Sequence, residues 1–305
     1  MTITIGGDLT VGPIGYGAMR LTGPELWGEY PDRAGGIALL RDAVDAGLTL
    51  IDTADVYGPH TCEQLIRDAL WPYPDGLMIA TKGGFVRGGP ALTSIDAVGN
   101  ATYLRQSARL SARRLGLDRI DLYYLHSGYA RDVPFEEQVG TLAELRADGL
   151  IRHIGLSNVT PDQLAAARRI VEIAAVTAHF NVGDRVETPL LDAAVEDGAV
   201  FVPWQPVSLT VPGAATDTRG PEHARQVLDP IAARHTATVS QVSLAWLLAR
   251  APGIMPCPGT TSTAHLRENL AAASLKLDAT EIAAIDGIAP PDPASSSAGR
   301  DYRAV

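Results

Sequence analysis

Short apolar runs alternate with stretches of helical periodicity eight times along this 305-residue chain. Such runs are typical of buried strands, and apolar residues every three or four positions indicate amphipathic helices. Eight βα units in a chain of this length predict a (β/α)8 TIM barrel, with a doubly wound open sheet as the alternative. The strands are expected at 14–19, 48–52, 77–82, 121–126, 153–157, 174–180, 199–205 and 253–259. The helices are expected near 34–46, 61–70, 102–115, 135–148, 161–173, 188–197, 238–250 and 263–273.

Further elements are expected outside the repeated pattern. Residues 3–10 contain a Gly-Gly-Asp turn between two short alternating runs, which predicts an N-terminal β-hairpin that plugs the bottom of the barrel. A stretch with helical periodicity near 222–234 predicts an extra helix between strand seven and its helix. We therefore expect a single domain over 1–288 and a low-complexity, flexible C-terminal tail over 289–305.

Composition and charge exclude several classes of protein. A hydrophobic fraction of 46% with 20% charged residues is typical of a soluble globular protein, and no apolar run approaches the roughly 20 residues of a membrane helix. The net charge of −10 argues against a nucleic-acid partner, and the arginines between 105 and 114 are interpreted as a solvated helix face. The two cysteines, Cys62 and Cys257, have no metal-ligand spacing, and no signal peptide precedes the first strand. A cytoplasmic protein without a metal site is expected.

Polar residues stand at the predicted carboxyl ends of several strands, where a barrel builds its chemistry. Strand two ends in Asp52, strand three in Lys82 and strand four in His126. Tyr57 follows in the loop after Asp52. Taken singly, each has an ordinary structural explanation, such as a capped turn or a hydrogen-bonded rim histidine. Together, the four predict a site that handles protons.

This group of side chains suits the protonation of an oxyanion formed from a carbonyl. A phenol has a reference pKa of ~10, so Tyr57 would need a nearby cation that stabilises the phenolate, and Lys82 would supply it. Asp52 would hold the ammonium in place, and His126 would hydrogen-bond the substrate oxygen. Hydrolysis fits less well, because no nucleophile elbow and no metalloprotease helix motif is present. The pair of glycines at 15 and 17 is too short a fragment for a dinucleotide fingerprint.

Several segments, in the same order, resemble the aldo-keto reductase family. They are residues 15–19, 52–58, 79–83, 121–126, 151–158, 258–261 and 265–269. The resemblance spans nearly the whole chain. Within the family, residues 21–24 and 55–60 look most like the branch that includes bacterial pyridoxal reductases.

The resemblance implies a (β/α)8 reductase that binds a nicotinamide cofactor, usually NADPH, without a Rossmann fold. The family's catalytic tetrad falls on Asp52, Tyr57, Lys82 and His126. The cofactor-binding positions of the family fall on Gly17, Ala18, Met19, Asp52, Ser157, Asn158, Thr177, Trp204, Gln205, Pro206, Ser208, Gly259, Thr260, Thr261, His265, Glu268 and Asn269. Among these, the pattern places Ser157 and Asn158 on the nicotinamide carboxamide and Trp204 under the nicotinamide ring. It places the residues from 259 onward beside the adenosine end.

Three departures from the family pattern bear on the site. Thr177 stands where many members have a glutamine, and the loss of that hydrogen bond to the carboxamide is worth about 1 kcal/mol. Residues 259–262 lack the Lys or Arg that some members present to the 2′-phosphate. NADPH or NADP+ is the expected cofactor, and NADH is left open. The segment 127–132 after His126 also differs, which predicts an atypical substrate mouth.

Aromatic side chains at the predicted mouth suit a flat carbonyl substrate. Trp27, Tyr30, Phe85 and Trp204 are expected in or near loops at this mouth. The residues expected against the substrate are Trp27, Tyr57, Phe85 and His126. The expected reaction is NADPH-dependent reduction of an aldehyde or ketone by hydride transfer, with Tyr57 as proton donor. Pyridoxal to pyridoxine is its narrower version.

Three alternatives to this reaction follow from the same residues. They are a biosynthetic reductase of a larger ketone or imine, a weakly active redox-sensing subunit, and an isomerase or lyase that uses Lys82 as a Schiff-base amine. The expected partner is a small carbonyl molecule, and the oligomeric state is left open.

Overall fold

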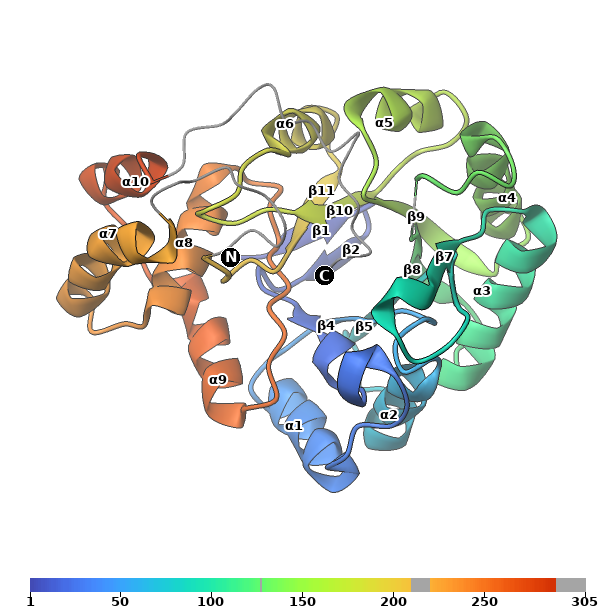
Figure 1. Ribbon diagram of the computed structural model, residues 1–305, viewed down its shortest axis with the longest axis horizontal. Coiled ribbons are helices and arrows are strands. Elements are labelled where there is room, and N and C mark those ends of the chain that lie inside the picture. The colour runs from blue at the N-terminus through green and yellow to red at the C-terminus, as the bar shows by residue number, and fades with distance from the viewer. Residues whose placement is uncertain (127, 210–219, 289–305) are drawn as a thin grey trace.

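The computed structural model places a parallel sheet at the centre of the molecule, with helices around it (Figure 1). It describes residues 1–126, 128–209 and 220–288. The strands of this sheet are β3 (Tyr16–Gly17), β4 (Leu50–Asp52), β5 (Met78–Gly83), β8 (Ile120–Leu125), β9 (Ile151–Ser157), β10 (Ala175–His179) and β11 (Val200–Trp204). They are hydrogen-bonded in chain order from β3 round to β11. This order, without a reversal, confirms the predicted (β/α)8 barrel over the doubly wound sheet.

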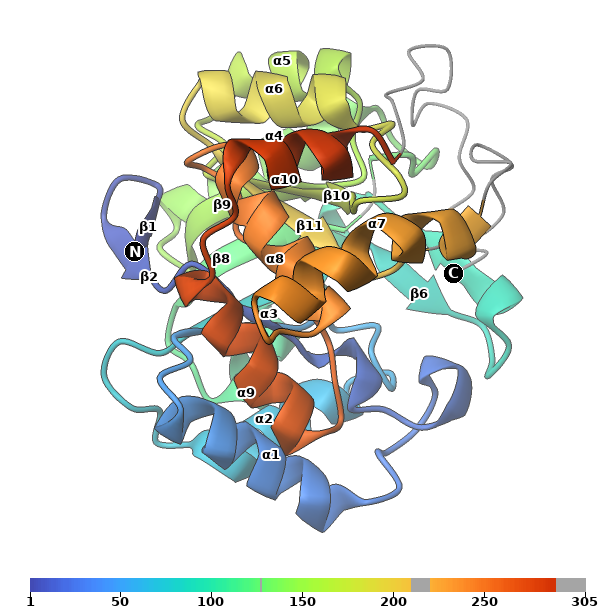
Figure 2. The same cartoon turned by 90° about the vertical axis from the view of Figure 1, so that its left-hand side faces the viewer.

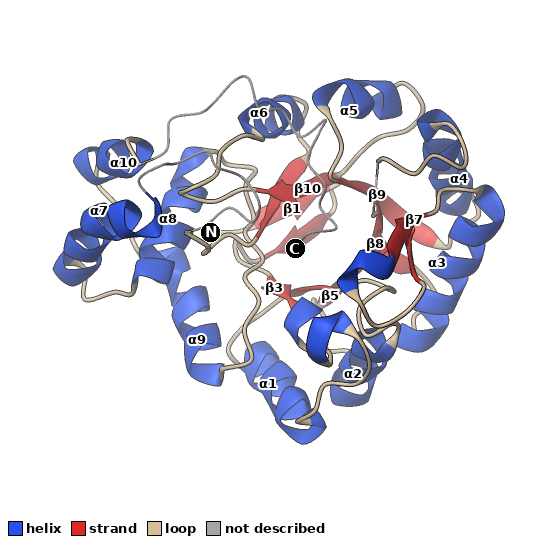
Figure 3. Cartoon of the chain, viewed as in Figure 1, coloured by secondary structure: helices blue, strands red, loops and turns tan. Residues whose placement is uncertain are grey.

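Ten α-helices lie in the described ranges and surround the sheet (Figure 3). They are α1 (Arg33–Asp45), α2 (Thr61–Leu70), α3 (Ala101–Leu115), α4 (Phe135–Ala147), α5 (Pro161–Arg168), α6 (Thr188–Glu196), α7 (Gly220–Arg234), α8 (Val239–Arg250), α9 (Thr263–Ala271) and α10 (Ala279–Asp286). Eight follow the predicted strands, and α7 is the predicted extra helix. The helix α10 was not predicted. None of the helices in the described ranges is long and apolar enough to cross a membrane.

An extended segment, residues 253–259, fills the eighth position of the barrel, and we call it the closing segment. Met255 N donates to Phe201 O on β11 (2.9 Å), and the N–H of the last residue of β3 donates to Pro258 O (3.2 Å). The prediction of a regular strand here is wrong. Pro256 and Pro258 have no N–H to return to β3, so the hydrogen bonds on that side run in one direction only.

Alternate residues of each strand face the inside of the barrel and the surrounding helices. Inside, Leu50, Leu122 and Val202 pack with Ile5 of the N-terminal hairpin. This hairpin joins β1 (Ile3–Ile5) to β2 (Leu9–Val11) and covers one end of the barrel, as predicted. Its apolar residues therefore complete the interior core at that end.

A second hairpin lies at the opposite end of the barrel (Figure 2). It joins β6 (Phe85–Arg87) to β7 (Ile95–Ala97) in the connection between β5 and α3. The sequence did not predict it. The predicted flexible tail over 289–305 lies outside the described residues, and the division of the chain at residue 288 stays a prediction.

Candidate active site

Three of the predicted polar residues face the inside of the barrel at the carboxyl end of the sheet. Asp52 on β4 and Lys82 on β5 each follow an interior apolar residue by two positions, and His126 stands in the same relation to β8. A spacing of two keeps a side chain on the same face of a strand. All three residues are at most 9% exposed. The barrel therefore gathers an acid, an amine and an imidazole within one enclosed space.

Asp52 and Lys82 form a buried ion pair across β4 and β5. Lys82 Nζ donates to Asp52 Oδ1 and to Thr53 O (2.9 Å). Burial alone lowers the pKa of Lys82, but the interactions with Asp52 and Tyr57 together outweigh burial, and the pKa is raised. Burial raises the pKa of Asp52, and Lys82 opposes that rise. We favour the charged pair, because a charged ammonium binds the two oxygens that Lys82 Nζ contacts more strongly than a neutral amine would.

The loop after β4 carries Tyr57 to this pair. Tyr57 N donates to Ala54 O (3.2 Å), which closes a tight turn, and Gly58 follows at a φ of +86°, where glycine is favoured. Lys82 Nζ lies 5.4 Å from the centroid of the Tyr57 ring. The centroids of the Tyr57 and His126 rings are 6.1 Å apart. The structure therefore brings the four residues of the predicted tetrad together.

Burial sets the protonation of the two aromatic members of the tetrad. Burial raises the pKa of the Tyr57 phenol; Lys82 opposes this rise, as expected from the sequence, but does not reverse it. Tyr57 therefore keeps its proton at neutral pH. Burial lowers the pKa of His126 well below its ordinary value, and the Lys82 charge adds to this effect. His126 is therefore a neutral ring with one N–H to donate, and its Nδ1 has no partner among the described residues.

Aromatic rings also lie next to His126. The ring centroid of Phe85, on β6, lies 4.5 Å from that of His126. The ring of Tyr129 lies 5.9 Å from Phe85. Phe85, which the sequence predicted as a substrate contact, thus lies next to the tetrad. The hairpin that carries Phe85 was not predicted.

Trp27 lies beside the Tyr57 loop, and Tyr30 does not. Trp27 forms a backbone bridge with Gly58 and is 37% exposed, with the Arg87 guanidinium 5.4 Å from its ring centroid. Tyr30 instead packs with the apolar residues of α1 and α2 on the outside of the sheet. The expectation that Tyr30 lies near the mouth is therefore wrong.

The predicted cofactor residues other than Asp52 lie on the other half of the barrel, from β9 round to β3. Ser157 and Thr177 are register partners on β9 and β10. Trp204 Nε1 donates to Asn158 Oδ1 (3.1 Å), and Asn158 Nδ2 donates to Ser157 Oγ (3.2 Å). The indole of Trp204 is thus held in place by the two residues predicted to bind the carboxamide.

The turn after Trp204 carries the next three predicted residues. Gln205 has a φ of +50°, an uncommon value for a residue other than glycine. Ser208 N donates to Gln205 O (3.1 Å), which closes the turn around the buried Pro206. Strained backbone of this kind is frequent at ligand sites.

The predicted residues Gly17 and Gly259 meet where the closing segment approaches β3. A Cβ at Gly17 would lie 2.8 Å from Cys257 O, and one at Gly259 would lie 2.8 Å from Gly17 O. The two backbones approach so closely that only glycine fits at either position. Ala18 and Met19 continue from β3 into a short 3-10 turn.

The helix α9 begins just beyond this contact. Its cap, Ser262, accepts a hydrogen bond from His265 N (3.4 Å), and Ser262 N donates to Thr260 Oγ1 (3.1 Å). Hydroxyl groups and the first-turn N–H groups of a nine-residue helix are therefore gathered at one place. The other predicted residues of this segment are Thr261, which is exposed, Glu268, which is half-buried, and Asn269, which is buried.

Comparison with known proteins agrees with this architecture. The profile of the Aldo/keto reductase family matches residues 13–290. The chain belongs to the aldo/keto reductase family. A curated member, pyridoxine 4-dehydrogenase of Escherichia coli strain K12, is 41% identical over 292 residues, which cover 94% of this chain and 98% of that protein.

Two solved aldo/keto reductases share the fold of this one. The thermostable aldo-keto reductase Tm1743, in complex with the inhibitor epalrestat, is 28% identical, has a TM-score of 0.80, and covers 94% of this chain and 99% of its own. An aldo-keto reductase from Klebsiella pneumoniae, in complex with NADPH, is 25% identical, has a TM-score of 0.77, and covers 96% of each chain. The predicted family, the barrel and the oxidoreductase class are confirmed.

Sequence reasoning missed two side chains in the site of this aldo/keto reductase. His179 is 2% exposed, its ring centroid lies 4.5 Å from that of Trp204, and its Nδ1 lies 2.8 Å from Asp184 Oδ2. The spacing of two from Thr177 along β10 was the signal that could have placed His179 inside the barrel. Tyr129 is the second side chain that sequence reasoning missed. The unusual segment 127–132 after His126 was the signal that could have identified it.

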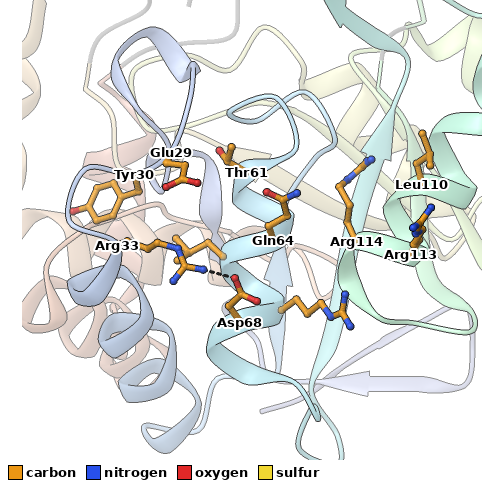
Figure 4. Close-up of a pocket in the computed structure, with 11 residues that line it drawn as sticks. Glu29, Tyr30, Arg33, Thr61, Gln64, Asp68, Leu110, Arg113 and Arg114 are labelled. Atoms are coloured by element: carbon orange, nitrogen blue, oxygen red, sulfur yellow. Dashed lines mark hydrogen bonds and ion pairs between the residues drawn. The ribbon is translucent and has the colours of Figure 1, made fainter.

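A groove of about 550 Å³ lies on the outside of this aldo/keto reductase, between the start of α1, α2 and α3 (Figure 4). None of the tetrad residues lines it, so it is not the site of the carbonyl chemistry. Arg33 and Asp68 form an ion pair in its wall. Arg114 also lines it, but this side chain is only 12% exposed and its Nε donates to buried Glu63 (2.6 Å). The predicted solvated arginine face of α3 is wrong at Arg114.

Proposed function

We propose that this aldo/keto reductase uses NADPH to reduce an aldehyde or ketone to an alcohol, with Tyr57 as the proton donor. The observation that carries the proposal is a partly buried, protonated phenol beside the Asp52–Lys82 ion pair and a neutral imidazole. A protonated phenol supported by a fixed cation suits proton donation to a carbonyl oxygen.

The residues on the other half of the barrel fit a phosphorylated nicotinamide cofactor. The hydroxyl of Thr260 and the capped N-terminus of α9 offer donors that suit a phosphate. The indole of Trp204, held by Asn158, offers an aromatic face close to polar groups that suit a carboxamide. NADPH, the expected cofactor, is also the one named in the Klebsiella structure. When bound, NADPH supplies the hydride that reduces the carbonyl carbon.

The residues of the tetrad would then complete the reaction. Tyr57 donates its proton to the carbonyl oxygen as negative charge develops there. Lys82 stabilises the phenolate that remains, because its ammonium lies 5.4 Å from the ring centroid. The neutral ring of His126 donates a hydrogen bond that directs the substrate oxygen. Asp52 keeps the ammonium charged and in place.

The aromatic surroundings of His126 favour a flat, ring-bearing carbonyl substrate. Phe85 and Tyr129 stand next to one another on one side of the tetrad, and Trp27 lies beside the Tyr57 loop. Flat rings pack well against such surfaces. Because the Escherichia coli relative is named pyridoxine 4-dehydrogenase, we propose pyridoxal and pyridoxine as the substrate and product of this chain.

We propose the cytoplasm as the location and a small carbonyl molecule as the partner. Cys62 and Cys257 are both buried and unpaired, which accords with a reducing compartment.

The proposal is tested by an NADPH-oxidation screen of the purified protein against pyridoxal, 4-nitrobenzaldehyde, a quinone and a bulky ketone. We expect pyridoxal to be reduced with the highest kcat/KM. A higher kcat/KM for the bulky ketone would mean that the substrate is larger than pyridoxal. NADPH binding without oxidation in any assay would favour a redox-sensing subunit, and a borohydride-trapped adduct on Lys82 would favour Schiff-base chemistry instead.

A further inference from the structure

A second carboxyl group is buried in the loop that carries Tyr57. Asp55 stands two residues before Tyr57, is 3% exposed, and takes no part in the reaction described above. Its Oδ2 accepts a hydrogen bond from Ser107 Oγ (2.6 Å). Its Oδ1 is buried and has no hydrogen-bond partner among the described residues. A buried carboxyl with only one oxygen satisfied calls for a physical explanation.

Ser107, on α3, connects Asp55 to the strands of the tetrad. Ser107 Oγ lies 3.0 Å from the hydroxyl of Tyr123, which is on β8 three residues before the tetrad histidine. Both hydroxyls pack against Gly83 so closely that a Cβ there would overlap them. The backbone of Asp55 also donates to Lys82 O (3.1 Å). Asp55 is thus linked directly to the backbone of Lys82 and, through Ser107, packed against the next residue, Gly83.

Tyr103, also on α3, extends these contacts to the substrate side. Its hydroxyl lies 3.4 Å from Asp55 Oδ2 and donates to Phe85 O (2.6 Å). Phe85 is the residue whose ring packs against His126. The Asp55 carboxyl is therefore in contact, directly or through one side chain, with the loop that carries Tyr57, with the strands of the tetrad and with Phe85.

The charged and titratable groups around Asp55 come from three elements. They are Glu63 on α2, Tyr103 and Arg114 on α3, and Tyr123 on β8. Burial raises the pKa of Asp55 to about 7, and Glu63 adds to the rise, whereas Ser107 and Arg114 oppose it. Part of the Asp55 population is therefore ionised at neutral pH.

The buried carboxyl of Asp55 lowers the free energy of unfolding as the pH rises. Because its pKa is higher in the folded than in the unfolded chain, the stability linked to Asp55 is fully present below about pH 4 and is lost progressively as the pH rises from about 4 to about 7. An asparagine would avoid this cost, but as a neutral acceptor it would bind Ser107 only about half as strongly as a carboxylate does. Strained or poorly satisfied groups of this kind are concentrated at functional sites.

We infer that Asp55 is a positioning residue for the proposed reduction: its carboxyl, held by Ser107, fixes the loop that carries Tyr57 against the other strands of the tetrad. The inference rests on the proposed function. A phenol that donates a proton must point at the substrate oxygen, and misplacement by about 1 Å can lower turnover up to about 100-fold. Ser107 acts through the same contact and belongs to the same positioning group.

The test uses the full chain with NADPH and pyridoxal, in the variants Asp55→Asn, Asp55→Ala and Ser107→Ala and the double variant Asp55→Ala with Ser107→Ala. Asp45→Asn is the matched control, because Asp45 is exposed on α1. We expect the two alanine variants each to lower kcat about tenfold or more, with the affinity for NADPH, measured by fluorescence, within about twofold of wild type. The double variant should be no slower than the worse single variant, because both changes break one contact.

Asp55→Asn separates positioning from folding. Its Tm relative to wild type should rise as the pH increases from about 4 to about 7 and then level off, because only the wild-type carboxyl titrates differently in the folded and unfolded chains. Its kcat should nevertheless fall several-fold, because a neutral amide holds Ser107 more weakly than a carboxylate does. A residue that acts only on stability would not give these opposite changes. If Asp55→Ala does not fold, Asp55→Asn and Ser107→Ala decide. A kcat within twofold of wild type in both would overturn the positioning role alone, whereas a wild-type protein without turnover would overturn the proposed function and this inference with it.

Discussion

The proposed role of Tyr57 depends on its hydroxyl group, which is the only group that replacement by phenylalanine removes. Tyr57→Phe keeps the partly buried ring beside Lys82 and removes the proton that the proposed reaction needs. We expect kcat for pyridoxal reduction to fall by about 100-fold to 10,000-fold. The affinity for NADPH should stay within about twofold, because the predicted cofactor residues other than Asp52 lie on the other half of the barrel. Steady-state kinetics and fluorescence titration measure the two quantities, and near wild-type turnover would remove Tyr57 from its proposed role.

The pKa directions of the tetrad predict opposite pH profiles for the two directions of the reaction. Burial raises the pKa of Tyr57, so the proton needed for reduction is present through neutral pH and is lost only at strongly alkaline pH. Oxidation of the alcohol needs the phenolate and should become faster as pH rises. His126 stays neutral through the same range because its pKa is well below the ordinary value. Rates of pyridoxal reduction with NADPH and of pyridoxine oxidation with NADP+ test this, and two profiles that rise together would contradict it.

The tetrad could be predicted from single residues, whereas its supporting side chains could not. Each member stands at or just past the end of an apolar run, so the strand pattern alone gathers them at one end of a barrel. Asp55 looks like an ordinary turn residue in the same loop. Its partner Ser107 is 52 positions away in sequence. Its burial depends on how α3 packs against β5 and β8, and no local pattern reports such packing.

The helices α2 and α3 share a buried ion pair that holds them to the sheet. Arg114 Nε donates to Glu63 Oε2 (2.6 Å), and Thr81 on β5 donates to the other oxygen of Glu63 (2.7 Å). Arg114→Met leaves a fully buried carboxylate without its cation, which should lower the free energy of unfolding by about 3–5 kcal/mol. Arg113→Met, at the exposed neighbouring position, should change it by less than about 0.5 kcal/mol. Urea denaturation measures both.

A double replacement separates the ion pair from simple loss of packing. Glu63→Gln combined with Arg114→Met removes both charges, so its cost should be well below that of Arg114→Met alone. An equal or larger loss in the double variant would mean that the arginine stabilises the helices through its hydrocarbon stem and not through its charge.

At the level of elements, the sequence predicted those with a long periodic pattern, and the N-terminal hairpin from its Gly-Gly-Asp turn, but missed the hairpin β6–β7 and the helix α10. The helices that follow the predicted strands were found because their apolar residues repeat over several turns. The hairpin β6–β7 has only three residues in each strand, next to several glycines, so it gives no periodic signal. The closing segment was predicted as a strand from its apolar residues, but its prolines cannot donate to the neighbouring strand.

Closure of the barrel depends on the contact between the closing segment and β3. Because Pro256 and Pro258 donate no hydrogen bonds, the two backbones are held together by few bonds and by close approach. The close approach requires that neither Gly17 nor Gly259 have a side chain. The same contact places the predicted cofactor residues of β3 beside those that precede α9. The stability of the whole molecule and the geometry of the predicted cofactor site therefore both depend on these two glycines.

Gly17→Ala tests this dependence, because its Cβ would lie 2.8 Å from the backbone oxygen of Cys257 and neither backbone can move without opening the barrel. We expect the free energy of unfolding to fall by about 1–3 kcal/mol, as for other overpacked sites. The affinity for NADPH should fall as well. Gly140→Ala is the matched control: Gly140 lies inside α4 with nothing within 4 Å of a Cβ, so alanine should stabilise the helix by about 0.5–1 kcal/mol and leave NADPH affinity unchanged. Equal stability changes in the two variants, measured by urea denaturation, would show that the closing contact tolerates a side chain and that barrel closure does not depend on it.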